Sequence, residues 1–172
     1  MKESLAQIRL LLLDVDGVLT DGRIIYDNNG VESKAFNVRD GHGLKMLQRA
    51  GVSVGIITGR ESAIVTHRAQ ELDIEFVYQG AKDKLVPYEQ ILAKTGFSEK
   101  QVAYVGDDVV DLPILRRVGC SFTVADGCAE VKPHVDYITT CAGGCGAVRE
   151  ICDMLLHESG HWDEITARYF AG

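Results

Sequence analysis

Long apolar runs are absent from this 172-residue sequence, which argues against a membrane-spanning segment. The longest candidate, Leu10–Leu13, is ended by Asp14, far short of the ~20 apolar residues that a spanning helix needs. The opening residues, MKESLAQIR, contain no apolar signal core and no small-residue cleavage site. We therefore expect a cytoplasmic protein with no membrane partner.

An excess of positive charge is also missing. The chain has 18 lysines and arginines against 25 aspartates and glutamates, which gives a net charge of −7. Nucleic acids and anionic membrane surfaces are bound by basic faces. We therefore expect no nucleic-acid partner, although a few basic residues could still gather around one site.

Cysteine is scarce and confined to the last third of the chain, at positions 120, 128, 141, 145 and 152. An odd number of cysteines without a secretion signal favours free thiols over disulfides. Cys141 and Cys145 have no second cysteine or histidine pair at the spacing of a zinc site. We interpret the cysteines as small apolar side chains of the core rather than as metal ligands.

Proline-rich linkers, blocks of like charge and internal repeats are all absent. The length suits one domain, with two small domains as the weaker alternative. Hydrophobic residues make up 46% of the chain, which is enough for a core. We predict one domain over residues 1–172, with a hairpin flap at about 22–38 and a C-terminal tail at about 159–172.

Apolar segments alternate with amphipathic ones along the chain. Short apolar runs predict buried strands within residues 8–14, 52–58, 75–80, 101–108, 120–125 and 134–139. Helical spacing predicts helices within residues 41–51, 61–73, 83–96, 109–119 and 146–160. Residues 23–38 predict a hairpin, because the sequence NNG tolerates the positive φ of a tight turn. This pattern is typical of an α/β doubly wound parallel sheet, here with a β-hairpin inserted after the first strand.

Polar side chains follow four of the predicted strands. They are Asp14 and Asp16 after the first, Thr58 and Arg60 after the second, Lys84 after the third, and Asp107, Asp108 and Asp111 after the fourth. Sites in parallel sheets form beyond the carboxyl ends of the strands, so we expect these groups to converge. Buried carboxylates are unfavourable unless they are paired or bind a cation, and Mg²⁺ with oxygen ligands meets that need.

A magnesium site with a hydroxyl and an ammonium group beside it suggests phosphoryl transfer, because both groups suit phosphate oxygens. We predict that Asp14 is the nucleophile and forms an aspartyl-phosphate, and that Asp16 is the general acid and base. Thr58 and Lys84 complete the catalytic set, with Lys84 neutralising Asp14 and the phosphoryl group, and Asp107 is the main distant metal ligand. Asp108 and Asp111 are expected to orient these groups, unless they only begin a helix.

Four segments in order resemble the motifs of the haloacid dehalogenase superfamily: DVDGVLT, IITGR, QGAKDKL with Lys84, and VGDDVVD. The resemblance implies a Rossmann-like fold with Mg²⁺ as cofactor. It places the metal on a side-chain oxygen of Asp14, the backbone carbonyl of Asp16, and Asp107. The second aspartate implies a phosphatase or phosphomutase, and the spacing leaves no room for a cap domain.

Over nearly the whole chain, the segments DVDGVLTDG, FNVRDGHG, ITGRES, YQGAKDKL and AGGCGAVRE resemble the family of 3-deoxy-D-manno-octulosonate (KDO) 8-phosphate phosphatases. This resemblance implies hydrolysis of an acidic sugar phosphate in lipopolysaccharide biosynthesis, by a homotetramer whose neighbouring subunits shield the active site. It implies substrate contacts by Asp16, Asn37, Val38, Arg39, Asp40, Gly41, Lys45, Arg60, Arg68 and Lys84. Taken alone, Arg60 and Arg68 fit surface helix charges as well as ligand contacts, and Lys45 fits a solvated helix charge better than a ligand contact.

Several alternatives stay open at this level. A related family that cleaves nonulosonate (KDN or sialic acid) 9-phosphates tends to carry glutamate where this chain has Arg60, which favours the octulosonate. A response-regulator receiver domain would need a phosphoacceptor after a middle strand, where this chain has Thr58, and the intact set of acidic and basic residues argues against a catalytically silent assembly module. The glycine-rich segment 142–146 is interpreted as a close-packed helix start. The tail is either disordered or a lid over a neighbour's active site.

Overall fold

The computed structural model describes residues 5–171 and contains a six-stranded parallel sheet in the order β5-β4-β1-β6-β7-β8. The strands are β1 Leu10–Leu13, β4 Ser53–Ile57, β5 Phe76–Tyr78, β6 Val102–Val105, β7 Cys120–Thr123 and β8 Tyr137–Ile138. From β1 the chain adds β4 and β5 on one side of the sheet order. It then returns to pair β6 with the other side of β1, and β7 and β8 follow there. The predicted doubly wound α/β fold is confirmed.

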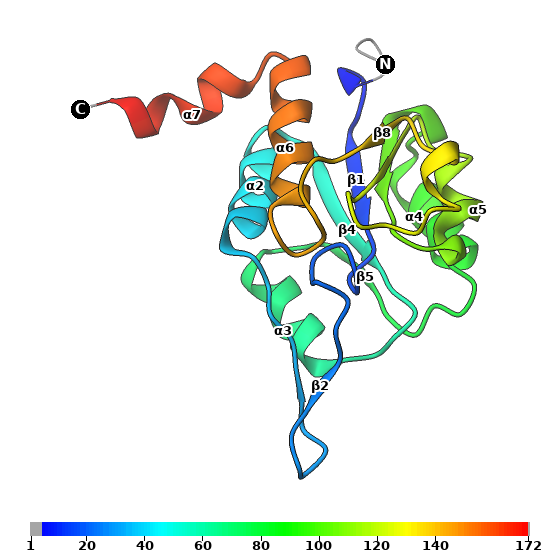
Figure 1. Ribbon diagram of the computed structural model, residues 1–172. Helices are drawn as coiled ribbons and strands as arrows, with labels where there is room; N and C mark the ends of the chain where they lie inside the picture. The colour runs from blue at the N-terminus through cyan, green and yellow to red at the C-terminus, as the bar shows by residue number, and fades with distance from the viewer. Residues whose placement is uncertain (1–4, 172) are drawn as a thin grey trace.

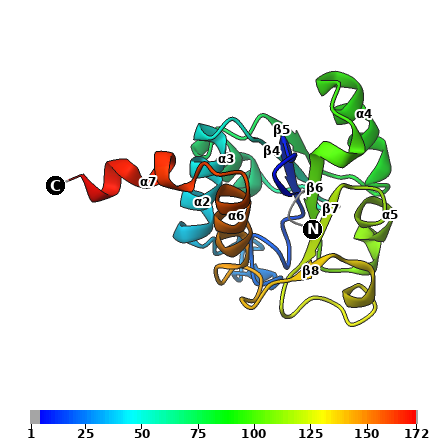
Figure 2. The same cartoon turned by 90° about the horizontal axis from the view of Figure 1, so that it is seen from above.

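Helices cover both faces of the sheet (Figures 1 and 2). On one side lie α2 Val38–Arg49, α3 Ala63–Glu71 and α6 Ala147–Glu158, and on the other lie α4 Leu85–Thr95 and α5 Leu112–Leu115. Leu11 and Leu13 of β1 pack into the core on the first side, while Leu10 and Leu12 pack into the core on the second. Burial on both faces explains why this strand is apolar at every position.

The expected hairpin is present as β2 Ile25–Tyr26 and β3 Glu32–Ser33, which pair antiparallel. Its turn is held by Asp27, whose side chain accepts hydrogen bonds from the N–H groups of Asn29 and Val31, each at 2.8 Å. Figure 1 shows the hairpin extending beyond the carboxyl ends of the strands. Its apolar residues Ile25 and Tyr26 are 47% and 58% exposed, so the hairpin is not buried in the chain's own core.

Three boundaries differ from the predicted ones. Helix α2 begins at Val38 rather than at residue 41, because the side chain of Asn37 caps it by accepting a hydrogen bond from Arg39 N–H. The helix predicted over 109–119 is broken into a 3₁₀ turn, η2 Val109–Asp111, and the short α5. Pro113 has no N–H to continue a helix from the preceding turn. The strand predicted over 134–139 is only Tyr137–Ile138, because the 3₁₀ turn η3 Lys132–His134 occupies its start.

The C-terminal tail forms a helix, α7 Trp162–Phe170, so the alternative of a disordered tail is wrong for its described residues, and Gly172 lies outside them. Trp162 stacks on His157 with ring centroids 4.2 Å apart, and Tyr169 OH accepts a hydrogen bond from Arg49 at 2.7 Å. Both views show α7 extending away from the body (Figures 1 and 2), and Figure 1 shows that it lies at the end opposite the hairpin. It does not cover its own chain's carboxyl edge.

All five cysteines are free, as predicted. Cys120 and Cys152 are buried in the core, but Cys128 and Cys141 are only partly buried and Cys145 is exposed. The interpretation of the cysteines as core side chains therefore holds for two of them. Among the described helices, none has the length and apolar character to cross a membrane.

Candidate active site

The residues that follow the first, second, third and fourth predicted strands meet at the carboxyl edge of the sheet. They line a cavity of about 340 Å³ together with Gly59, Ala81, Lys82 and Val110. The sequence-predicted residues in its wall are Asp14, Asp16, Thr58, Arg60, Lys84, Asp107 and Asp108. The convergence follows from parallel strands that present their carboxyl ends to the same side.

Lys84 lies between two carboxylates. Its Nζ is 2.6 Å from Asp14 Oδ2 and 2.6 Å from Asp111 Oδ1, and the side chain is almost fully buried. Burial alone would lower the pKa of Lys84, but the charges of Asp14 and Asp111 raise it above its ordinary value. The ammonium group is therefore charged at neutral pH and fixed in direction.

Asp111 is completely buried and its oxygens are fully used. Besides Lys84, Oδ1 accepts a hydrogen bond from Tyr104 OH at 2.6 Å. Oδ2 accepts from the N–H groups of Asp107 and Asp108 at 3.1 and 3.3 Å. This geometry fits the expectation that Asp111 orients Lys84 and the loop that carries Asp107. Asp108 accepts a hydrogen bond from Val109 N–H at 2.7 Å, so it caps η2 as well as lining the cavity.

Asp14 is held by both of its oxygens. Oδ1 accepts a hydrogen bond from Val15 N–H at 2.6 Å, and Oδ2 faces Lys84. Burial raises the pKa of Asp14 to about 6, against the opposing effect of Lys84. Burial, reinforced by the charges of Asp14 and Asp111, raises the pKa of Asp107 to about 7. Two carboxylates that resist ionisation side by side indicate a place for a cation.

The same residues fit a divalent metal ion. Asp14, Asp107 and Asp111 each offer an oxygen within 4.8 Å of the others. Asp107 Oδ1 is buried and has no hydrogen-bond partner among residues 5–171. A buried carboxylate oxygen without a donor is unfavourable, and a hard cation satisfies it. With Asp111 already bonded to donors, Asp14 and Asp107 are the carboxylates with capacity left for a metal.

Gly17 shapes this part of the site. Its φ is +90°, and a Cβ added there would lie 2.1 Å from Asp107 Oδ2. Only glycine lets the loop after β1 pass so close to the Asp107 carboxylate. On the other side, a Cβ added to Gly143 would lie 1.8 Å from the carbonyl oxygen of Gly17. The glycine-rich segment is therefore close-packed against this loop, as the sequence predicted.

Asp16 points away from Asp14, toward the hairpin. Its Oδ1 forms an ion pair with Lys34 Nζ, and its Oδ2 lies 3.7 Å from Arg60 Nε. Lys34 was not expected at the site, and neither was Glu32, which accepts a hydrogen bond from Arg60 at 2.7 Å. No sequence signal separates these residues from surface charges of the hairpin, because the fold alone brings them to Asp16.

The first turn of α2 does not line the cavity. Val38 is 81% exposed, whereas Asp40 is 1% exposed and its Oδ1 accepts a hydrogen bond from Arg149 N–H at 2.8 Å. Asp40 therefore caps the start of α6, and burial raises the pKa of its carboxyl. Arg39 lines a separate hollow of about 380 Å³ beside Cys141 and Arg149. The remaining residues of this turn are Asn37, whose amide donates to Gly144 O at 3.4 Å, and the buried Gly41.

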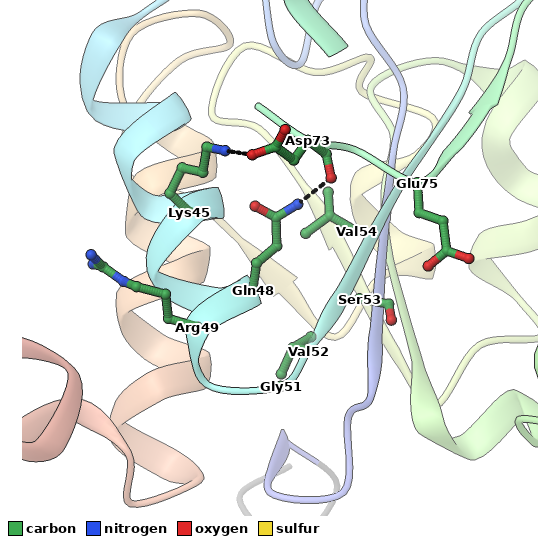
Figure 3. A pocket seen from close by; sticks show the side chains of 9 residues that line it. All are labelled: Lys45, Gln48, Arg49, Gly51, Val52, Ser53, Val54, Asp73 and Glu75. Carbon is green, nitrogen blue, oxygen red and sulfur yellow. Dashed lines mark hydrogen bonds and ion pairs between the residues drawn. The ribbon is translucent and has the colours of Figure 1, made fainter. Parts of the chain in front are cut away.

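Lys45 lies in a groove of about 470 Å³ at the amino-terminal edge of the sheet, where β4 begins (Figure 3). Figure 3 shows Lys45 and Gln48 both turned toward Asp73, where Lys45 forms an ion pair and Gln48 donates to the backbone oxygen. Arg68 stacks over Phe36 at 5.6 Å and pairs with Glu71 at 3.2 Å. Within one chain, neither Lys45 nor Arg68 reaches the cavity that holds Asp14.

Comparisons with known proteins agree with this geometry. Residues 38–119 match the model of the haloacid dehalogenase-like hydrolases. The 3-deoxy-D-manno-octulosonate 8-phosphate phosphatase KdsC of Escherichia coli K12 is 50% identical over 157 residues, 91% of this chain and 84% of the relative.

Two solved structures are also similar. The 3-deoxy-D-manno-octulosonate 8-phosphate phosphatase from Moraxella catarrhalis, in complex with magnesium ion, phosphate ion and KDO, gives a TM-score of 0.95 at 43% identity, covering 98% of this chain and 97% of that one. The phosphatase of the same name from Yersinia pestis gives a TM-score of 0.92 at 46% identity, covering 93% of this chain and 86% of that one.

Proposed function

This chain belongs to the family of KDO 8-phosphate phosphatases within the haloacid dehalogenase-like hydrolases, and from that premise we propose that it hydrolyses KDO 8-phosphate to KDO and phosphate. It is a phosphoric monoester hydrolase. The observation that carries the proposal is the buried contact of Lys84 with Asp14 beside the unpartnered oxygen of Asp107. We further propose that the reaction serves lipopolysaccharide biosynthesis in the cytoplasm.

Mg²⁺ is the cofactor, and the donor set of the site suits it. We propose that a side-chain oxygen of Asp14, the backbone carbonyl of Asp16 and the side chain of Asp107 hold the ion. Bound there, Mg²⁺ neutralises the carboxylates and the substrate phosphate, so that an anion can approach an anion. The hindered ionisation of Asp14 and Asp107 and the free oxygen of Asp107 support this assignment.

The proposed chemistry has two displacements. Asp14 attacks phosphorus, so that a bond to its carboxylate oxygen forms while the bond to the sugar oxygen breaks, and Asp16 protonates that oxygen. Asp16 then removes a proton from water, which attacks phosphorus and releases Asp14 and inorganic phosphate. Lys84 and the hydroxyl of Thr58 stabilise the charge on the phosphoryl oxygens.

We propose that Arg60 binds the carboxylate of the sugar acid, because a guanidinium forks around both oxygens and Arg60 lines the cavity. The other proposed substrate contacts, Asn37, Val38, Arg39, Asp40, Gly41, Lys45 and Arg68, lie outside the cavity of their own chain. We therefore propose that a neighbouring subunit shields the site and brings to it the exposed residues of this set, such as Val38 and Arg39, whereas Asp40 and Gly41 are buried in their own chain. The exposed apolar hairpin supports a homotetramer, and the helix α7, which extends away from the body, supports a lid over a neighbour's site.

The test compares Mg²⁺-dependent phosphate release from KDO 8-phosphate with release from a nonulosonate 9-phosphate. We expect a higher kcat/KM for the octulosonate, because Arg60 stands where the nonulosonate family tends to carry glutamate. Faster cleavage of the nonulosonate would overturn the substrate assignment. No hydrolysis of either, in the presence of Mg²⁺, would overturn the proposed function.

The shielding role of the tail is tested by ending the chain after Gly160. We expect the shortened enzyme to keep its oligomeric mass, because the hairpin remains, and to show a raised KM, because α7 no longer covers a neighbour's site. Size-exclusion chromatography with light scattering gives the mass. Unchanged kinetics would remove the lid proposal, and a monomeric mass for the full chain would remove the tetramer.

A further inference from the structure

One side chain at the base of the hairpin is buried, although most of the hairpin is exposed. Lys34, one residue beyond β3, has a side chain that is only 1% exposed. Its Nζ forms an ion pair with Asp16 Oδ1 and lies 3.5 Å from Glu32 Oε1. A lysine without water around its ammonium group is stable only when carboxylates surround it. Lys34 is thus committed to Asp16 and Glu32 rather than to solvent.

Glu32 connects Lys34 to the loop after β4. Its Oε1 accepts a hydrogen bond from Arg60 Nη2 at 2.7 Å, and its Oε2 accepts one from Ser62 Oγ at 2.9 Å. Arg60 Nε in turn lies 3.7 Å from Asp16 Oδ2. The four residues form a closed ring of alternating charge, which we call the Asp16 ring: Asp16, Lys34, Glu32 and Arg60.

We propose that Lys34 is a positioning residue for Asp16, and that through the Asp16 ring the hairpin base forms a wall of the active site. The proposal rests on the proposed function in one respect, the role of Asp16 as general acid and base. Asp14 and Asp107 repel the Asp16 carboxylate, so an unheld Asp16 would turn toward solvent. Lys34 fixes one oxygen of Asp16 and Arg60 faces the other, which sets the carboxylate on the leaving-group side of the cavity.

A purely structural role for Lys34, anchoring the hairpin, gives a different result. If Lys34 only anchored the hairpin, its loss would slow the hydrolysis of every substrate by the same factor. Loss of a correctly aimed general acid slows the first displacement, which kcat/KM reports, only for substrates whose leaving oxygen needs a proton. The general-base step on water is the same for every substrate, so its loss affects kcat for all of them. An alkyl phosphate, such as a sugar phosphate, leaves as a basic alkoxide and needs that proton. p-Nitrophenyl phosphate leaves as a stabilised phenolate and does not need it.

The experiment measures kcat and KM of wild type, Lys34→Met and Lys34→Arg for p-nitrophenyl phosphate and for an alkyl phosphate. We expect Lys34→Met to lower kcat/KM for the alkyl phosphate ~10-fold or more and for the aryl phosphate less than ~3-fold, with Lys34→Arg recovering most of the loss. The matched control is Lys100→Met, an exposed lysine just before β6 at the opposite edge of the sheet. Activity on the aryl phosphate also shows that each variant is folded.

A double-mutant cycle with Asp16→Asn completes the test. If Lys34 acts through Asp16, Lys34→Met costs less than ~2-fold in alkyl phosphate turnover once Asp16 is replaced. Equal losses for both leaving groups, or fully additive losses in the cycle, would overturn the inference. Hydrolysis of KDO 8-phosphate by the wild-type enzyme is measured in a separate assay. Failure of the proposed substrate therefore gives a different result from failure of the proposed role of Lys34.

Discussion

The two edges of the sheet carry charged groups in opposite circumstances. At the carboxyl edge, Asp14 is 6% exposed, Lys84 is 5% exposed and Asp111 is completely buried. At the amino edge, the paired side chains of Lys45 and Asp73 are 36% and 83% exposed. Both edges have a hollow of similar size, about 340 Å³ against about 470 Å³. The size of a hollow therefore does not identify the site.

Desolvation is what separates the two edges. A buried carboxylate keeps its charge only when partners or a metal replace the lost water, so the carboxyl edge is incomplete without its cation. An exposed ion pair replaces contacts with water by a contact between its two charged groups, and this adds little to the free energy of unfolding. The buried charges of the carboxyl edge therefore support catalysis but lower the stability of the chain. The exposed charges of the amino edge contribute little to either catalysis or stability.

The largest effect is expected from Asp14→Asn. The variant loses the proposed nucleophile, so turnover should fall at least ~10³-fold. Stability should stay equal or rise, because the raised pKa of Asp14 means that its charge is unfavourable in the folded chain, and Lys84 keeps Asp111 as a partner. Steady-state assays and thermal unfolding measure the two quantities. Retained turnover, or a large fall in melting temperature, would contradict the contrast between the edges.

Gly17→Ala should have the next largest effect. The new Cβ would collide with Asp107 Oδ2, so the loop must shift and the metal ligands separate. We expect Mg²⁺ affinity to fall ~10-fold or more, as measured by isothermal titration calorimetry. The matched control is Gly30→Ala at the hairpin tip, where φ is also positive, +77°, but the added Cβ would meet nothing within 4 Å among residues 5–171 other than its chain neighbours. Equal losses in both variants would mean that backbone strain, not the approach to Asp107, is the cause.

The two carboxylates that these variants disturb, Asp14 and Asp107, were predicted from the sequence alone, and the reason is local. Four buried leucines followed by Asp14 specify a strand and the group at its end, because the pattern depends only on neighbouring positions. Lys34 and Glu32 escaped notice because a hairpin residue meets Asp16 only after the chain has turned back on itself. Lys45 is expected to bind substrate, and within its own chain it pairs with Asp73, outside the cavity that holds Asp14. The direction of this side chain depends on how α2 packs, which a short sequence segment does not specify.

A smaller effect concerns Mg²⁺ and pH. The pKa values of Asp14 and Asp107 rise from 3.8 to about 6 and about 7 on folding. Between about pH 4 and about pH 7 the folded chain binds more protons than the unfolded chain. The free energy of unfolding without metal therefore falls as the pH rises through this range. Mg²⁺ binds the ionised carboxylates, so its stabilisation should grow through the same window. We expect the Mg²⁺-induced rise in melting temperature to be small near pH 5 and largest above about pH 7.

Scanning fluorimetry with and without Mg²⁺ across this range measures that prediction. The control is Asp14→Asn, which removes one of the two titrating ligands and should weaken both the metal effect and its pH dependence. A rise in melting temperature that is independent of pH would mean that Mg²⁺ binds elsewhere on the chain. A rise that is largest at low pH would reverse the sign required by the two carboxylates.

The smallest effect is expected at the amino edge, from the pair of Lys45 and Asp73. Asp73 has a positive φ of 51°, so Asp73→Asn is the suitable change, since asparagine tolerates that backbone and loses only the charge. Combined with Lys45→Met in a double-mutant cycle, it should give a coupling free energy of unfolding below ~1 kcal/mol, reduced further by salt. Urea unfolding of the four proteins measures it. A coupling free energy above ~2 kcal/mol would show that the pair is desolvated by contact with another subunit. The difference in burial between the two edges would then hold only for the isolated chain.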